Sequence, residues 1–143
     1  MTAKDFVGTW RLVSMEARSS TGAVNYPLGQ DCGGLIIYTA DGYMSVVIYR
    51  AGRERFGTRD IMAGTEAQLA GAARSYVSYA GRYQVRGDRV HHDLEASFFP
   101  DWVGTTQERI YELKGSRLTL STDPIPLGGA ELRVVLIWER VKT

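Results

Sequence analysis

The sequence predicts a mostly β protein, an eight-stranded antiparallel up-and-down barrel with one short helix between the third and fourth strands. Segments in which apolar and polar residues alternate follow one another along nearly the whole chain, separated by short breaks that contain glycine. One stretch departs from this alternation and has helical spacing instead. Closure into a barrel removes the exposed edges of an open sheet, and an open β-sandwich is the alternative.

Alternation and turn residues define the strands. The predicted strands cover residues 8–18, 34–39, 43–50, 78–86, 89–97, 104–113, 117–122 and 131–141. The breaks Asp41-Gly42, Gly87-Asp88 and Lys114-Gly115-Ser116 are typical of hairpin turns, so neighbouring strands are expected to pair in sequence order. An eight-stranded barrel has an interior that side chains just fill or that holds one small ligand.

The helix is predicted over residues 65–76. Thr65 and Gln68 have the spacing of a capping box, in which each side chain satisfies a free backbone N–H of the first helical turn. Apolar residues then recur at helical spacing, at Leu69, Ala72, Ala73 and Tyr76. Gly71 weakens the helix at its centre, and another short helical turn is expected before Phe6.

Length and composition exclude several classes of protein. A chain of 143 residues fits one domain over residues 1–143. The net charge of +1 gives no field that would attract nucleic acid or an anionic membrane. Cys32 is the single cysteine, the first residues lack the pattern of a secretory signal, and a cytoplasmic location is expected. No metal site is expected, because adjacent strand residues such as His91 and His92 point apart. No cofactor is expected either, because the paired glycines match neither a P-loop nor a dinucleotide fingerprint.

The strand at 89–97 shows which histidine faces inward. Val90, Leu94 and Ala96 share the parity of His92, whereas His91 shares the parity of the charged residues of the segment. His92 is therefore expected inside the barrel and His91 outside. The same argument predicts inner faces at Tyr79, Gly81, Tyr83 and Val85; at Gln107, Arg109, Tyr111 and Leu113; at Leu118 and Leu120; at Leu132, Val134, Leu136 and Trp138; and at Trp10, Leu12, Met44, Val46 and Ile48.

An interior of this composition is typical of a pocket for a small molecule. The polar groups expected in it are His92, Arg109 and Gln107 together with three tyrosine hydroxyls. The residues expected to bind the ligand are Met44, Tyr79, Tyr83, Gln107, Tyr111, Trp102 and Trp138.

Several segments resemble a known family. Phe6-Val7-Gly8-Thr9-Trp10-Arg11-Leu12 resembles the Gly-x-Trp opening strand of lipocalins. The runs Tyr79–Tyr83, His92–Ser97, Pro100–Gly104, Leu118–Leu120 and Trp138–Arg140 resemble the bacterial and fungal lipocalin-like domain family. The resemblance implies a calycin-type barrel, a cavity for a small hydrophobic molecule, and packing of Trp10 under Arg140. Classical lipocalins are secreted and contain disulfides, whereas this sequence shows neither a secretory signal pattern nor a pair of cysteines.

Two residues are candidates for chemistry, and each has a structural alternative. His92 titrates near neutrality and is a candidate acid or base, or else a core histidine satisfied by a neighbouring hydroxyl. Arg109 is a candidate partner for a ligand carboxylate, phosphate or enolate oxygen. Alternatively, Arg109 pairs with Glu16 or another inward carboxylate, or stacks on Trp10.

Other residues carry weaker signals. Each inward tyrosine is a hydrogen-bond donor for a ligand carbonyl or a packing residue. Cys32 would be a nucleophile only if it faced His92, and no known nucleophile motif surrounds it. The basic stretch at 50–55, with Arg59 nearby, either draws an anionic ligand to the barrel mouth or forms a solvated loop.

Two functions are compatible with these patterns. The first is non-catalytic binding of a small hydrophobic or amphipathic molecule in the barrel. The alternative is a cofactor-independent isomerase or cyclase that acts on a polyketide-like substrate, with His92 as acid or base and Arg109 or a tyrosine stabilising an oxyanion. A purely structural domain fits less well, because the predicted inner face is aromatic and polar.

Overall fold

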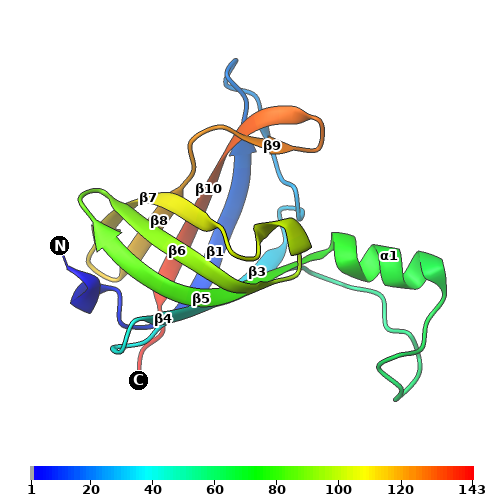
Figure 1. Cartoon of the computed structure of the whole chain (residues 1–143). Coiled ribbons are helices and arrows are strands. Elements are labelled where there is room, and N and C mark those ends of the chain that lie inside the picture. Colours follow the sequence, from blue (N-terminus) through cyan, green and yellow to red (C-terminus); the bar gives the residue numbers. More distant parts are fainter. Residues whose placement is uncertain (1) are drawn as a thin grey trace.

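The computed structural model describes residues 2–143 and shows an antiparallel barrel closed on itself (Figure 1). Each barrel strand pairs with the next, and pairing of the first with the last closes the ring, as the sequence predicts. The strands are β1 (Gly8–Arg18), β3 (Cys32–Tyr38), β4 (Tyr43–Arg50), β5 (Tyr76–Arg86), β6 (Arg89–Ser97), β7 (Thr106–Lys114), β8 (Arg117–Ser121) and β10 (Ala130–Arg140).

Two very short strands extend one rim of the barrel and were not predicted. β2 (Val24–Asn25) pairs with the end of β1, and β9 (Ile125–Leu127) pairs with the start of β10. Segments this short contain no measurable alternation, so only the neighbouring strand reveals them. Together with the upper parts of β1 and β10, they project beyond the barrel in Figure 1.

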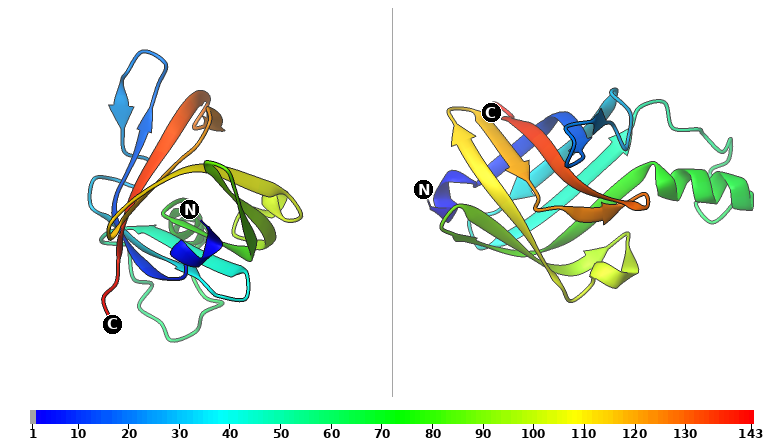
Figure 2. Two further views of the ribbon diagram at one scale, coloured as in Figure 1. Left: turned by 90° about the vertical axis from the view of Figure 1, so that its left-hand side faces the viewer. Right: turned by 90° about the horizontal axis from the view of Figure 1, so that it is seen from above.

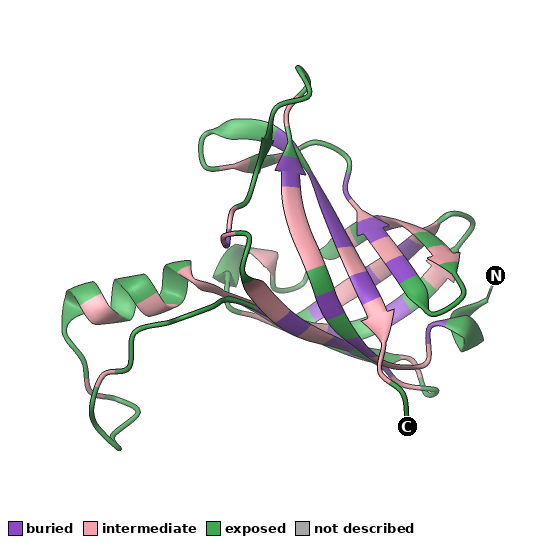
Figure 3. Ribbon diagram, turned by 180° about the vertical axis from the view of Figure 1, so that it is seen from behind, coloured by how far each residue is buried: buried purple, intermediate pink, exposed green. Residues whose placement is uncertain are grey.

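The predicted helix is present as α1 (Glu66–Arg74), between β4 and β5. Gln68 N donates to Thr65 Oγ1 over 3.1 Å, and Thr65 N donates to Gln68 Oε1 over 3.0 Å, so the capping box forms as expected. The helix projects away from the barrel and buries none of its residues (Figure 3). Leu69, Ala72 and Ala73 therefore mark a helix without a packed face, whereas Tyr76, predicted as the end of the helix, is the first residue of β5.

Two β-bulges interrupt the alternation. Val13 is an extra residue in β1 opposite β10, and Glu95 is an extra residue in β6 opposite β5. Beyond each bulge the inner and outer faces exchange. Ala96, predicted to face inward with His92, is therefore exposed. In β1, beyond its own bulge, Met15 and Ala17 take the inner positions.

Aromatic residues seal one end of the barrel. The N-terminal segment, with a short 3-10 helix at Ala3–Asp5, lies across this end in the left view of Figure 2. Phe6 is fully buried and makes edge-to-face contacts with Tyr38 and Tyr111. The expected packing of Trp10 is also present, because the Arg140 guanidinium carbon lies 4.1 Å from the indole ring. The interior is thus filled at this end and open to a ligand only at the other.

Candidate functional site

The inner half of the barrel opposite Phe6 contains a cavity of about 340 Å³. Ligand sites typically measure about 300–1,000 Å³ and have mainly apolar walls with a few polar groups. The walls of this cavity are formed by Met15, Ile36, Val46, Ile48, Val77, Leu120, Val134 and Leu136. Tyr79, Arg109, Thr122 and Trp138 add the polar groups. The size and composition fit one small, largely apolar molecule.

Two segments frame the mouth of the cavity. The turn after β6, which includes a short 3-10 helix at Pro100–Trp102, contributes Phe98, Phe99 and Trp102. These three rings pack against one another with centroids 5.7–6.3 Å apart, and Trp102 also contacts Tyr79 edge-on. Residues 125–128 of the β9 hairpin contribute to the lining as well.

Arg109 brings a positive charge to the cavity wall. Its side chain is buried, with 8% relative exposure, and its Nη1 donates to the Glu108 carbonyl oxygen over 2.9 Å. Among residues 2–143 no carboxylate lies within ion-pair distance of Arg109. Both predicted structural alternatives are absent, since Glu16 pairs with Arg18 and Trp10 lies under Arg140. Burial of a cation without an ion pair is costly, so Arg109 is an unusual member of an otherwise apolar wall.

His92 is held behind this wall rather than in it. It is fully buried, its Nε2 lies 2.8 Å from the Tyr38 hydroxyl, and its Nδ1 lies 3.0 Å from the Tyr79 hydroxyl. Burial, with a contribution from the charge of Arg109, lowers the pKa of His92 to about 3. The imidazole is therefore neutral at physiological pH, and both of its nitrogens already have partners.

The two tyrosine hydroxyls bonded to His92 play opposite hydrogen-bonding roles. Burial raises the pKa of Tyr79, while the charge of Arg109 and a hydrogen bond from it oppose that rise. In a neutral imidazole one ring nitrogen donates and the other accepts, so one of the two tyrosine hydroxyls donates to His92 and the other accepts from it. Tyr79 thus connects the cavity wall to the buried histidine.

One buried donor near the cavity, the Trp138 indole N–H, has no partner among residues 2–143. Trp138 is among the residues around the cavity, but its Nε1 is enclosed by protein atoms and has no acceptor in the part of the chain that the structure describes. Thr122, by contrast, is satisfied, because its Oγ1 accepts from Val134 N over 3.0 Å. Thr122 was not predicted in the lining, since it lies at the end of a predicted strand, where alternation is weakest as a guide.

The structure divides the predicted site into two groups. Tyr79, Trp102, Arg109 and Trp138 line the cavity, whereas Met44, Tyr83, His92, Gln107 and Tyr111 do not. Tyr83 and Tyr111 donate to the Thr39 and Gly87 carbonyls, which joins strand ends rather than facing a ligand. Parity places these residues on the inner face, but it does not show at which height along the barrel each one lies.

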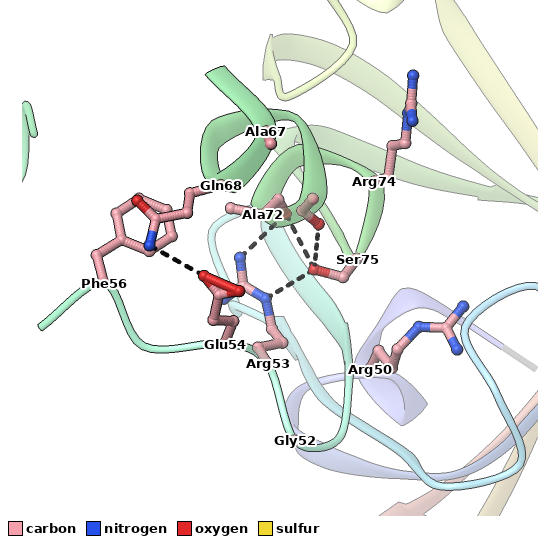
Figure 4. Close-up of a pocket in the computed structure, with 11 residues that line it drawn as sticks. Arg50, Gly52, Arg53, Glu54, Phe56, Ala67, Gln68, Ala72, Arg74 and Ser75 are labelled. Atoms are coloured by element: carbon pink, nitrogen blue, oxygen red, sulfur yellow. Dashed lines mark hydrogen bonds between the residues drawn. The ribbon is translucent and has the colours of Figure 1, made fainter. Parts of the chain in front are cut away.

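The basic stretch at 50–55 lies beside α1 and encloses a separate hollow (Figure 4). Arg53 donates to Ser75 Oγ and to the Ala72 carbonyl, and Gln68 Nε2 donates to Glu54. These bonds fasten the loop to the helix. Arg53 thus has a structural contact, and the hollow lacks the apolar walls of the barrel cavity.

The other candidate groups do not form a reactive centre. Cys32 packs against the barrel core, and burial raises the pKa of its thiol, which disfavours the nucleophilic thiolate. Within residues 2–143, no three His, Cys, Asp or Glu side chains come together as a metal site. No helix in the described chain is long and apolar enough to span a membrane.

Known proteins resemble this chain to different degrees. The model of the lipocalin-like domain family matches residues 7–141. A 4'-hydroxy-3'-methoxypropiophenone carrier protein, ppsC of Aspergillus oryzae, is 37% identical over 107 residues, which cover 68% of this chain and 96% of that protein. Among solved structures, a single-site mutant of the fluorescent protein UnaG aligns with a TM-score of 0.42 and 14% identity, over 96% of this chain and 97% of that one.

Proposed function

The chain belongs to the lipocalin-like domain family, and from this premise we propose that it carries one small aromatic molecule in its barrel cavity. The observation that supports this most directly is the cavity of about 340 Å³ with apolar walls and a filled opposite end. Phe6 and Trp10 seal that end, so a ligand enters and leaves by the mouth near Trp102. The function is binding and release, without a chemical step.

The proposed ligand class is an aryl ketone or phenol of about the size of the molecule named for the Aspergillus oryzae relative. Aromatic side chains favour such rings, because stacked and edge-on contacts add to the burial of apolar area. Tyr79, Trp102 and Trp138 provide these contacts in the wall and at the mouth. Arg109 provides donors for an oxygen of the ligand.

Catalysis by His92 is not favoured. The cavity lining does not include His92, and both ring nitrogens are occupied by tyrosine hydroxyls. With a pKa of about 3 it is a poor base near neutrality, since general catalysis is most efficient when the pKa lies near the working pH. The isomerase or cyclase alternative therefore lacks its acid or base.

We also propose a cytoplasmic location, on the basis of cysteine chemistry. Cys32 is a free thiol, and the sequence contains no second cysteine with which it could form an intramolecular disulfide. Localisation of the tagged chain in its native cell by fluorescence microscopy tests this, and an extracellular signal would contradict it.

Calorimetric titration with the propiophenone of the relative tests the proposed function. Val77→Trp adds a large ring to the cavity wall, whereas Ile37→Trp adds the same ring to the outer face of β3. Binding to the wild type and to Ile37→Trp, with loss in Val77→Trp, is the expected result. Equal affinity in all three proteins would place the ligand outside the barrel and overturn the proposal.

A further inference from the structure

We propose that the cavity selects ligands with an anionic oxygen, a carboxylate or an ionised phenol or enol, through recognition by Arg109. This inference rests on the proposed function and deepens it from an apolar ligand to an amphipathic one with a defined polar end. The observation behind it is a buried guanidinium that lines the cavity and has no carboxylate partner among residues 2–143.

The hydrogen-bonding capacity of Arg109 exceeds what the protein offers it. A guanidinium has five N–H donors in a planar fork. Among residues 2–143, the Glu108 carbonyl is the acceptor to which Arg109 donates, and the Tyr79 hydroxyl lies close enough to feel its charge. A carboxylate suits the remaining donors, because its two oxygens match the geometry of the fork and charge-assisted hydrogen bonds are the stronger kind.

The groups around Arg109 leave its charge uncompensated. Burial raises the pKa values of Tyr79 and Tyr38, so both stay neutral phenols at physiological pH. His92 is also neutral, and Thr122 carries no charge. The polar part of the cavity therefore has a net positive charge inside apolar walls, where electrostatic attraction is stronger than in water.

Three probes that share a naphthalene ring and differ only in their substituent test how the cavity recognises the polar end of a ligand. Ethylnaphthalene has no oxygen, acetonaphthone has one neutral carbonyl oxygen, and naphthoate has a carboxylate. Calorimetric titration gives the Kd of each for the wild type, Arg109→Met and Arg82→Met. Arg109→Met keeps the unbranched stem of the side chain and removes the charged guanidinium, while Arg82→Met removes the same group from an exposed position bonded to Tyr43.

The wild type and Arg82→Met are expected to bind naphthoate most tightly and ethylnaphthalene most weakly. Arg109→Met should weaken naphthoate binding by about 10- to 100-fold, the range expected for loss of hydrogen bonds to a charged group. Its affinity for ethylnaphthalene should change by less than about twofold, which shows that the cavity persists.

Three results would overturn the inference. Equal affinity of the wild type for naphthoate and ethylnaphthalene would show that the anion is not recognised. An equal loss of all three probes in Arg109→Met would make Arg109 a structural residue. Absence of binding by every probe and by the propiophenone would remove the proposed function itself, which is distinct from the first two outcomes.

Discussion

The Tyr79 hydroxyl lies 3.0 Å from Nδ1 of His92, and the Tyr79 side chain separates that histidine from the cavity. A ligand therefore meets Tyr79 and Arg109 in the wall, while His92 fixes the orientation of Tyr79 from behind. The histidine that the sequence marks as the sharpest chemical candidate is in this arrangement a supporting residue, held neutral by burial.

The depressed pKa of His92 predicts a loss of stability in mild acid. Its pKa is about 3 in the folded protein and 6.5 for an unperturbed histidine, as in the unfolded chain, so the unfolded chain binds the proton first. The stabilisation is complete above pH 6.5 and declines as the pH falls towards 3. Between pH 7 and pH 5 this histidine should lower the free energy of unfolding by about 2 kcal/mol, measured by urea denaturation.

Two controls separate His92 from other groups. His92→Gln should abolish this part of the pH dependence, whereas His91→Gln should leave it in place, because His91 is only partly buried beside Glu108. In the wild type, the ring nitrogens of His92 should show the NMR shifts of a neutral imidazole throughout this range. A ring that becomes protonated near pH 6 would contradict this assignment.

Trp10 is expected to be a major source of stability. It is fully buried under Arg140, and its Nε1 donates to the Phe6 carbonyl over 2.9 Å. Trp10→Ala should cost about 3–5 kcal/mol, as other replacements of core aromatic residues do. Chemical denaturation measures this, and an unchanged midpoint would show that Trp10 does not close the barrel.

Trp102→Ala, unlike Trp10→Ala, should lower ligand affinity and leave the stability of the fold nearly unchanged. Trp102 is only partly buried and contacts Phe98 and Phe99 at the mouth, where a large side chain bears on the ligand more than on the core. We expect ligand affinity to fall by about tenfold, which corresponds to about 1.4 kcal/mol, with the unfolding midpoint close to that of the wild type. A large loss of stability with unchanged affinity would assign Trp102 to the fold alone.

Two glycine substitutions should act in opposite directions. A Cβ on Gly81 would lie 1.9 Å from the Asp93 carbonyl oxygen, so Gly81→Ala must distort the pairing of β5 with β6 at the bulge. A Cβ on Gly71 meets nothing within 4 Å, and Gly71→Ala should stabilise α1 by up to about 1 kcal/mol. Thermal denaturation of Gly81→Ala and amide exchange in α1 of Gly71→Ala measure the two effects. A melting temperature of Gly81→Ala equal to that of the wild type would contradict the close approach at Gly81.

Local patterns predict most of the barrel but not its irregularities. Val90, His92 and Leu94 lie inward as their parity requires, and the capping box at Thr65 begins α1. The alternation assigns Ala96 to the wrong face of the sheet, because the bulge at Glu95 adds a residue to β6. No local property of the chain reveals this extra residue. Bulges depend on the partner strand, which a single segment does not encode.

The site was predicted less completely than the fold. Parity identifies an inner face but not a position along the barrel axis, so Tyr79 and Tyr83 are equivalent in the sequence. In the structure Tyr79 lines the cavity, and Tyr83 bonds the Thr39 carbonyl near the sealed end. The N-terminal segment decides this difference, because Phe6 fills one half of the barrel and leaves the other open.

A crystal structure of the protein with naphthoate would show directly whether the barrel cavity holds an anionic aromatic ligand. We expect the naphthalene ring between Ile48 and Trp138 inside the barrel, with a carboxylate oxygen about 2.7–2.9 Å from the Arg109 guanidinium. Electron density for the ligand only in the hollow beside α1, or inside the barrel with its carboxylate directed away from Arg109, would contradict recognition by Arg109.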